Sequence, residues 1–175
     1  MEPHWTFGAT AVLFGIRPST QFPFCSILYI WKIVSEKLKT AMTAGLHVVL
    51  CLGETLEQRE SGQTTSVIQS QLSSVLLQEG LDFSRLVIAY EPVWAIGTGK
   101  VASPQEAEEV HADIRAWLSD NLGAQVASLV RIIYGGSVNA ANCATLIACE
   151  NIDGFLVGGA SLKPSEFLTI IKSCA

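Results

Sequence analysis

The sequence predicts an α/β protein built around four parallel strands. Three observations lead to this prediction: apolar runs of strand length recur along the chain, apolar residues at helical spacing separate them, and glycines end several of the segments. Near-continuous apolar runs are typical of parallel strands that are buried on both faces. The pattern fits an open doubly wound sheet and part of a closed barrel equally well.

Four apolar runs define the predicted strands, and helical spacing defines the segments between them. The predicted strands are His47–Gly53, Leu86–Tyr90, Arg131–Tyr134 and Gly154–Gly158. The predicted helices cover residues 33–42, 67–76, 103–120 and 141–148, and a last helix runs from Lys163 toward the C-terminus. The third helix has the clearest start, because Ser103 suits the N-cap, Pro104 suits the first turn and Glu106 completes a capping box.

Composition narrows the classes of function. The formal charge is −5, from 11 basic and 16 acidic residues, and no basic run or aromatic-plus-basic stripe occurs. We therefore expect no binding to nucleic acid or to an anionic membrane surface. The apolar stretches 6–16 and 22–31 do not support a signal peptide or a membrane span. The five cysteines lack CxxC spacing, so we expect no disulfide framework, no structural zinc site and a cytoplasmic location.

A candidate general base stands at the end of the second predicted strand. Glu91 follows Tyr90 directly, and Pro92 to Trp94 come next. Parallel sheets place their chemistry at the carboxyl ends of the strands, so a carboxylate fixed there by proline and backed by tryptophan suits proton transfer. The glycines at positions 97 and 99 would let the next segment move as a lid. The alternative is a surface glutamate before an ordinary flexible loop.

Glycine pairs follow the third and fourth predicted strands. They lie in Tyr134-Gly-Gly-Ser-Val138 and in Leu156-Val-Gly-Gly-Ala-Ser161. Glycine lets backbone N–H groups approach an oxyanion closely, and the N-terminus of a following helix favours negative charge. One such pair alone usually marks a tight turn. Two pairs in successive βα units favour a phosphate site.

These motifs together resemble the triosephosphate isomerase family. The resembling segments are Cys51–Glu54, Ala89–Lys100, Tyr134–Val138 and Gly154–Lys163. The match begins near Ile33 and implies an incomplete (β/α)₈ TIM barrel with about four parallel βα units over residues 33–175. Residues 1–32 diverge, and the stretch 8–15 is at most a remnant of the family's fourth strand.

The resemblance also implies roles for individual residues. Glu91 would move a proton between adjacent carbons of a triose phosphate through an enediolate, without a metal or an organic cofactor. The substrate phosphate would bind Gly97, Ser137, Gly158 and Gly159. The lid hinges would be Pro92-Val93-Trp94 and residues 100–102, with Gly99 between them; Tyr134 and Ser137 would contact the lid backbone at Ala102 and Gly99. Lys100 would begin the second hinge.

The same resemblance indicates what the chain lacks. The family's first strand ends in Asn-x-Lys, and its fourth ends in Gly-His-Ser-Glu, whose histidine polarises the substrate carbonyl; neither motif occurs before Glu91. His47 is expected about 23 Å from the functional end of its strand. His111 lies in a predicted outer helix, and His4 precedes the matching region. All three are predicted to be surface or packing histidines.

Three interpretations remain open. The first is a triosephosphate isomerase of the glycolytic pathway, and the second is an impaired or inactive fragment that keeps the base, the lid and the phosphate loops. The third is another phosphate-binding barrel enzyme, such as an aldolase, which would not share all four motifs. A half barrel exposes apolar strand edges and half of the barrel interior, so we expect marginal stability or association through those edges. The family's homodimer is in doubt, because its contacts come largely from the other half.

Overall fold

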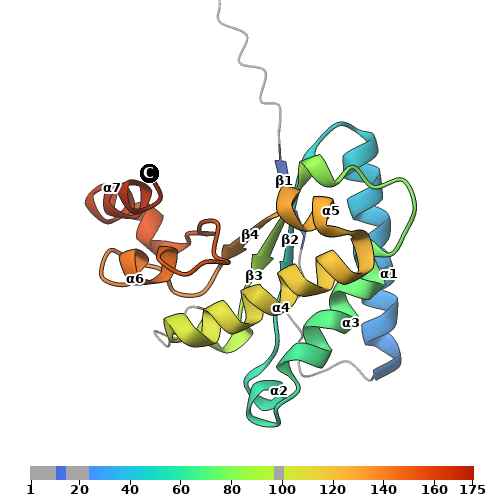
Figure 1. Ribbon diagram of the computed structural model, residues 1–175, viewed down its shortest axis with the longest axis horizontal. Helices are drawn as coiled ribbons and strands as arrows, with labels where there is room; N and C mark the ends of the chain where they lie inside the picture. The colour runs from blue at the N-terminus through green and yellow to red at the C-terminus, as the bar shows by residue number, and fades with distance from the viewer. Residues whose placement is uncertain (1–10, 15–23, 97–100) are drawn as a thin grey trace, which may run out of the picture.

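The fold is a four-stranded parallel sheet with helices along one side (Figure 1). The computed structural model describes residues 11–14, 24–96 and 101–175, with side chains from Trp31 onward. The strands are β1 (Ala11–Phe14), β2 (His47–Leu52), β3 (Leu86–Tyr90) and β4 (Arg131–Tyr134), in the order β1-β2-β3-β4. Each neighbouring pair is parallel, so the carboxyl ends of all four strands lie at one edge of the sheet.

Three of the predicted strands are confirmed, and the fourth is wrong. β2, β3 and β4 stand at their predicted positions. The predicted strand 154–158 is reduced to an isolated parallel bridge between Tyr134 and Phe155. Among the described residues, this segment has a neighbour only on the β4 side, and a strand with one short partner gains few ladder hydrogen bonds. β1 pairs with β2 from Ala11 to Phe14, inside the stretch that only faintly resembles a family strand.

Helices separate the strands as predicted, but α1 begins earlier than predicted, and α2 and α5 were not predicted. The α-helices are α1 (Phe24–Thr43), α2 (Leu56–Glu60), α3 (Thr64–Leu76), α4 (Pro104–Leu122), α5 (Ala124–Leu129), α6 (Cys143–Ile147) and α7 (Pro164–Ser173). The 3₁₀ turns are η1 (Phe83–Arg85), η2 (Val93–Ala95) and η3 (Gly159–Leu162). α1 begins nine residues before the predicted start at residue 33, because an apolar run without polar spacing does not reveal its period.

Capping explains where two of these helices begin. The Ser103 side chain accepts a hydrogen bond from the Glu106 amide at 3.2 Å, and Glu106 Oε2 accepts one from the Ser103 amide at 2.7 Å. This reciprocal pair confirms the predicted start of α4. The short helix α2 was not predicted, although Thr55 and Gln58 form a second capping box there. The Thr-x-x-Gln spacing was the signal that would have found it.

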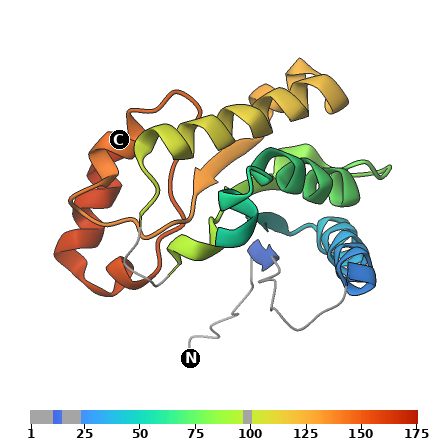
Figure 2. The ribbon, with the colours of Figure 1, turned by 90° about the horizontal axis from the view of Figure 1, so that it is seen from below.

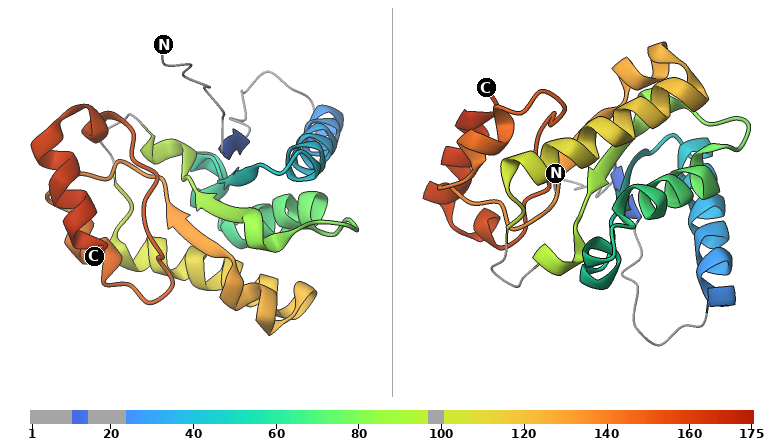
Figure 3. Two further views of the ribbon diagram at one scale, coloured as in Figure 1. Left: turned by 90° about the horizontal axis from the view of Figure 1, so that it is seen from above. Right: turned by 60° about the horizontal axis from the view of Figure 1, so that its bottom comes forward.

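The helices cover one face of the sheet (Figure 3). The face toward α1, α3 and α4 is fully buried at Leu50, Ile88, Ile132 and their strand neighbours. On the opposite face, Val49, Val87 and Ile133 are half-buried, whereas Cys51 and Ala89 are buried. The expectation of a sheet buried on both faces therefore holds only in part for the described residues. One covered face is what a segment of barrel wall has, since the inner face needs the rest of the barrel.

Apolar side chains are also exposed at the end of the molecule farthest from α1. Figure 2 shows α6 and α7 together there. The exposed fractions are 84% for Leu162, 51% for Leu168 and 49% for Ile171. In water, each of these side chains favours contact with another apolar surface.

We expect this surface, with the open sheet face, to make the chain associate with a second copy of itself. Replacing Leu162 and Ile171 by Glu should weaken association by about tenfold or more per residue, because each burial contributes roughly 1.5–3 kcal/mol. Sedimentation velocity over a range of concentrations measures this. Thr169→Glu, which adds the same charge to α7 without removing an exposed apolar side chain, is the control. A wild-type chain that stays monomeric and unfolds cooperatively would contradict the prediction.

Candidate active site

Backbone hydrogen bonds join three strand ends at the carboxyl edge of the sheet. The Glu91 amide, just after β3, donates to the Leu52 carbonyl of β2 at 2.7 Å. The Gly135 amide, just after β4, donates to the Tyr90 carbonyl at 2.8 Å. The Val93 amide donates to the Glu54 carbonyl at 3.0 Å. The loops that carry Glu54, Glu91 and Gly135 are therefore fixed side by side.

Glu91 occupies a slot between two glycines. A methyl group added to Gly53 would overlap the Glu91 carbonyl, and one added to Gly135 would lie 2.5 Å from the Glu91 Cγ atom. Glycine is thus required at both neighbours for Glu91 to take this position. The sequence predicted the Gly135-Gly136 pair as a phosphate loop, and did not predict that Gly135 makes room for the carboxylate.

The Cys51 thiol lies against the same carboxylate. Burial raises the pKa of Cys51, and a hydrogen bond and the charge of Glu91 raise it further. Cys51 therefore stays a neutral thiol beside Glu91. The candidate base is half-buried.

A second carboxylate, Glu54, is fully buried behind the site. Its Oε1 atom accepts hydrogen bonds from the Tyr90 hydroxyl and the Trp94 indole N–H, both at 3.1 Å, and from Arg59 at 3.3 Å. Burial, and then the charge of Glu54, raise the pKa of Tyr90, so this phenol stays protonated and donates. Residue-by-residue reading of the sequence missed this role; the only signal was a carboxylate directly after an apolar strand.

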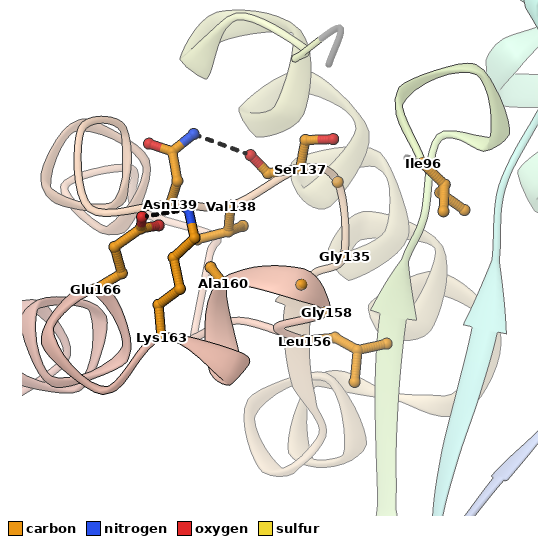
Figure 4. Close-up of a pocket in the computed structure, with 12 residues that line it drawn as sticks. Ile96, Gly135, Ser137, Val138, Asn139, Leu156, Gly158, Ala160, Lys163 and Glu166 are labelled. Carbon is orange, nitrogen blue, oxygen red and sulfur yellow. Dashed lines mark hydrogen bonds and ion pairs between the residues drawn. The ribbon is translucent and has the colours of Figure 1, made fainter. Parts of the chain in front are cut away.

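A cavity of about 450 Å³ lies beside Gly135, between the loop after β4 and the loop that follows Phe155 (Figure 4). Ser137, Gly158 and Gly159, three of the predicted phosphate residues, line it together. A methyl group added at Gly158 or Gly159 would meet nothing within 4 Å, so the backbone there borders open space. The fourth predicted residue, Gly97, lies outside the described residues.

Lys163 and Glu166 both line this cavity and form an ion pair there. The Lys163 Nζ atom pairs with Glu166 at 2.9 Å, and the Lys163 side chain is 68% exposed (Figure 4). The sequence placed Lys163 at the start of the last helix and gave it no role. A lysine and glycine-rich backbone around one cavity suit an anionic group such as a phosphate.

The predicted lid residues are placed in part. Pro92, Val93 and Trp94 lie at and in η2, and Ala102 is buried just before α4. Gly99 and Lys100 lie outside the described residues. The Ser137 hydroxyl donates to the Ala95 carbonyl at 2.5 Å, a different partner from the predicted one at Gly99.

Tyr134, the other predicted lid contact, is fully buried. Burial raises its pKa, and the nearby Ala102 backbone acts in the opposite direction. Within the described part of the chain, the Tyr134 hydroxyl makes no hydrogen bond of normal geometry. Ala102, the predicted partner of Tyr134, therefore lies close enough to Tyr134 to affect its pKa, and the hydrogen bond between them stays a prediction.

The described histidines stand away from this edge. His47 is exposed at the start of β2, at the opposite end of the sheet from Glu91. His111 is fully buried in α4, where its Nδ1 atom lies 2.7 Å from the Ala107 carbonyl and its ring packs edge-on against Tyr90 at 5.6 Å. Burial lowers the pKa of His111, so it is a neutral packing residue. His4 lies outside the described residues.

Among the described residues, no group of three or more histidine, cysteine or acidic side chains is arranged to hold a metal ion. None of the helices in that part of the chain has both the length and the apolarity to cross a membrane. Cys51, Cys143, Cys149 and Cys174 are free thiols.

Comparison with known proteins agrees with the resemblance seen in the motifs. Residues 31–174 match the family model for triosephosphate isomerase. The chain is 56% identical over 142 residues to the chloroplastic triosephosphate isomerase of Secale cereale. These aligned residues make up 81% of this chain and 47% of that protein. It is 54% identical to the glycosomal protein of that name from Trypanosoma cruzi and 55% identical to the cytosolic one from Oryza sativa subsp. japonica, covering 57% and 55% of them. The chain spans about half the length of the curated relatives it matches.

Proposed function

Because the chain belongs to the triosephosphate isomerase family, we propose that it acts in the interconversion of dihydroxyacetone phosphate and glyceraldehyde 3-phosphate, with Glu91 as the base. The observation that carries this proposal is the position of Glu91. Its carboxylate stands at the carboxyl edge of the sheet between Gly53 and Gly135, and Gly135 also lines the cavity of about 450 Å³. A base beside an anion site can remove a proton from a carbon of a substrate whose phosphate group is bound at that site.

The proposed reaction assigns each side of the site one task. Ser137, Gly158 and Gly159 hold the phosphate, and Lys163 balances its charge. Glu91 takes a proton from one carbon and returns it to the adjacent carbon, so that the enediolate intermediate carries the negative charge between the two steps. The hydroxyl proton must at the same time pass from one of the two oxygens to the other, which is a task for the group that polarises the carbonyl. The neutral Cys51 thiol beside the carboxylate adds no negative charge to the site. The lid assigned to Pro92–Ala102 by resemblance remains a prediction, since residues 97–100 lie outside the described part of the chain.

Enediolate formation also needs a group that polarises the substrate carbonyl. Neither described histidine supports that role, because His47 lies at the far end of the sheet and His111 is neutral and enclosed by Tyr90, Tyr134 and α4. We therefore propose that the described residues supply the base and the phosphate site of the reaction.

The test compares turnover with binding. We expect Glu91→Gln to lower the rate of glyceraldehyde 3-phosphate isomerisation by about 10²–10⁴-fold, the usual contribution of a general base. The affinity for glycerol 3-phosphate, which has the phosphate but cannot isomerise, should change little. Glu79→Gln, an exposed carboxylate outside the site, is the matched control. A wild-type rate no higher than that of Glu91→Gln would refute the proposed activity.

Two further assignments rest on indirect support. A cytoplasmic location is favoured by the unpaired cysteines, whereas the relatives' names give cytosol, chloroplast and glycosome. For assembly, the open sheet face and the exposed apolar residues of α7 favour contact with another copy of the chain.

A further inference from the structure

One arginine contacts the segments on both sides of residues 97–100. Arg59 lies in α2, after β2, and its side chain is 19% exposed. Its guanidinium lies 3.3 Å from Glu54 Oε1 and 3.0 Å from Glu106 Oε1. It also lies over the Trp94 ring, 5.3 Å from the centroid. Three partners from three different segments therefore converge on a single planar group.

The first contact of Arg59 is with Glu54, which is hydrogen-bonded to two residues close to Glu91 in the chain. Glu54 receives hydrogen bonds from Tyr90 and Trp94, which stand one residue before and three residues after Glu91. Because Glu54 is fully buried, its charge requires a nearby cation, and Arg59 is in ion-pair contact with it. Without Arg59, Glu54, which accepts hydrogen bonds from Tyr90 and Trp94, would carry an uncompensated buried charge.

The second contact of Arg59 is with Glu106 in the first turn of α4. Glu106 Oε2 accepts hydrogen bonds from the Ser103 amide at 2.7 Å and the Ser103 hydroxyl at 2.8 Å, while Oε1 pairs with Arg59. The two Ser103 bonds, and then Arg59, hold the pKa of Glu106 below its ordinary value, so it stays ionised at neutral pH. In Glu106, one carboxylate oxygen thus caps the helix at Ser103 and the other pairs with Arg59.

We propose that Arg59 is a positioning residue that couples the segment carrying Glu91 to the first turn of α4. Its two nitrogens bridge Glu54 and Glu106, so a displacement of Ser103 is transmitted to Trp94 and from there to the backbone of Glu91. A planar fork can hold both carboxylates at once, whereas the single ammonium of a lysine cannot. The kinetic consequence rests on the proposed isomerase function; the structural coupling does not.

Two conservative substitutions isolate this bridge. Glu106→Gln keeps the oxygen that caps Ser103 and removes the charge that pairs with Arg59, since Gln serves in capping boxes as well as Glu. Arg59→Lys keeps the charge beside Glu54 and removes the fork. Arg85→Lys is the control, because Arg85 pairs with Asp82 at the surface, away from the site. Circular dichroism checks that each variant is folded.

The first readout needs no activity. In ¹H–¹⁵N spectra of the ligand-free chain, both site variants should shift the Trp94 indole N–H resonance, identified by its loss in Trp94→Phe, whereas Arg85→Lys should not. The Ser103 amide should move in Arg59→Lys although residue 59 does not touch it. The remote effects are the Trp94 shift in Glu106→Gln and the Ser103 shift in Arg59→Lys, because Arg59 itself lies over the Trp94 ring. If neither of these two shifts occurs in the folded variants, the coupling is refuted, whether or not the chain is an isomerase.

The second readout is kinetic. Arg59→Lys should lower kcat by about tenfold to hundredfold with KM nearly unchanged, since displacement of a reacting group by about 1 Å can cost a hundredfold. The double variant with Glu106→Gln should be no slower than Arg59→Lys alone, because both changes break one bridge. Losses that multiply, or a raised KM at constant kcat, would overturn the proposal. An inactive wild type would refute the isomerase function and leave the spectroscopic test to decide the coupling.

Discussion

Gly53→Ala is expected to destabilise the fold by roughly 3 kcal/mol or more, at the upper end of the cost of overpacking. The added methyl group would overlap the carbonyl of Glu91, and the carbonyl carbon would lie only 2.7 Å away. The clash is with backbone, which cannot rotate aside as a side chain can. Relief would require β2 and β3 to separate where the Glu91 amide bonds to Leu52 at 2.7 Å.

Gly53 is also held from the other side. The Gln71 side chain of α3 donates to the Gly53 carbonyl at 2.9 Å and accepts from its amide at 3.0 Å, so the glycine cannot move without breaking a buried pair of bonds. Urea unfolding followed by circular dichroism measures the loss. Gly80→Ala is the control: its φ of +82° disfavours alanine, by about 1 kcal/mol, but nothing lies within 4 Å. Equal losses in the two variants would contradict the argument.

Gly135→Ala should instead impair catalysis with little effect on stability. The new methyl group would lie 2.5 Å from Cγ and 3.3 Å from Cδ of Glu91, and a side chain can swing away where backbone cannot. The carboxylate would move by about 1 Å, and we expect the isomerisation rate to fall by about a hundredfold. Unfolding in urea should shift by only about 1 kcal/mol.

A double-mutant cycle tests the cause of this loss. Glu91→Ala removes Cγ and Cδ, the two side-chain atoms of Glu91 that the new methyl group contacts. We therefore expect Gly135→Ala to slow the residual reaction of the Glu91→Ala variant far less than it slows the wild type. Equal losses in both backgrounds would show that Gly135 acts elsewhere, for example on the phosphate cavity.

Local sequence identified the parts of the fold that local physics decides. β2, β3 and β4 were found because each is an apolar run with turn residues at its ends. The start of α4 was found because its capping box lies within four residues. Where the deciding partner is remote, the prediction failed. Residues 154–158 have strand composition but only one neighbouring strand among the described residues, and they form a single bridge.

The same division runs through the site. The sequence by itself determined the family, the position of Glu91 at a strand end and the two glycine loops, because each is a contiguous motif whose chemistry depends on residues near in the chain. Only the tertiary structure decided that Gly53 and Gly135 enclose Glu91, that Ser137 reaches Ala95, and that Arg59 joins Glu54 to Glu106. Apart from the contact of Arg59 with Glu54, which are five residues apart, these contacts join residues 38 to 47 positions apart. Parallel βα units bring such residues together at the carboxyl edge through register and crossover, which no local pattern encodes.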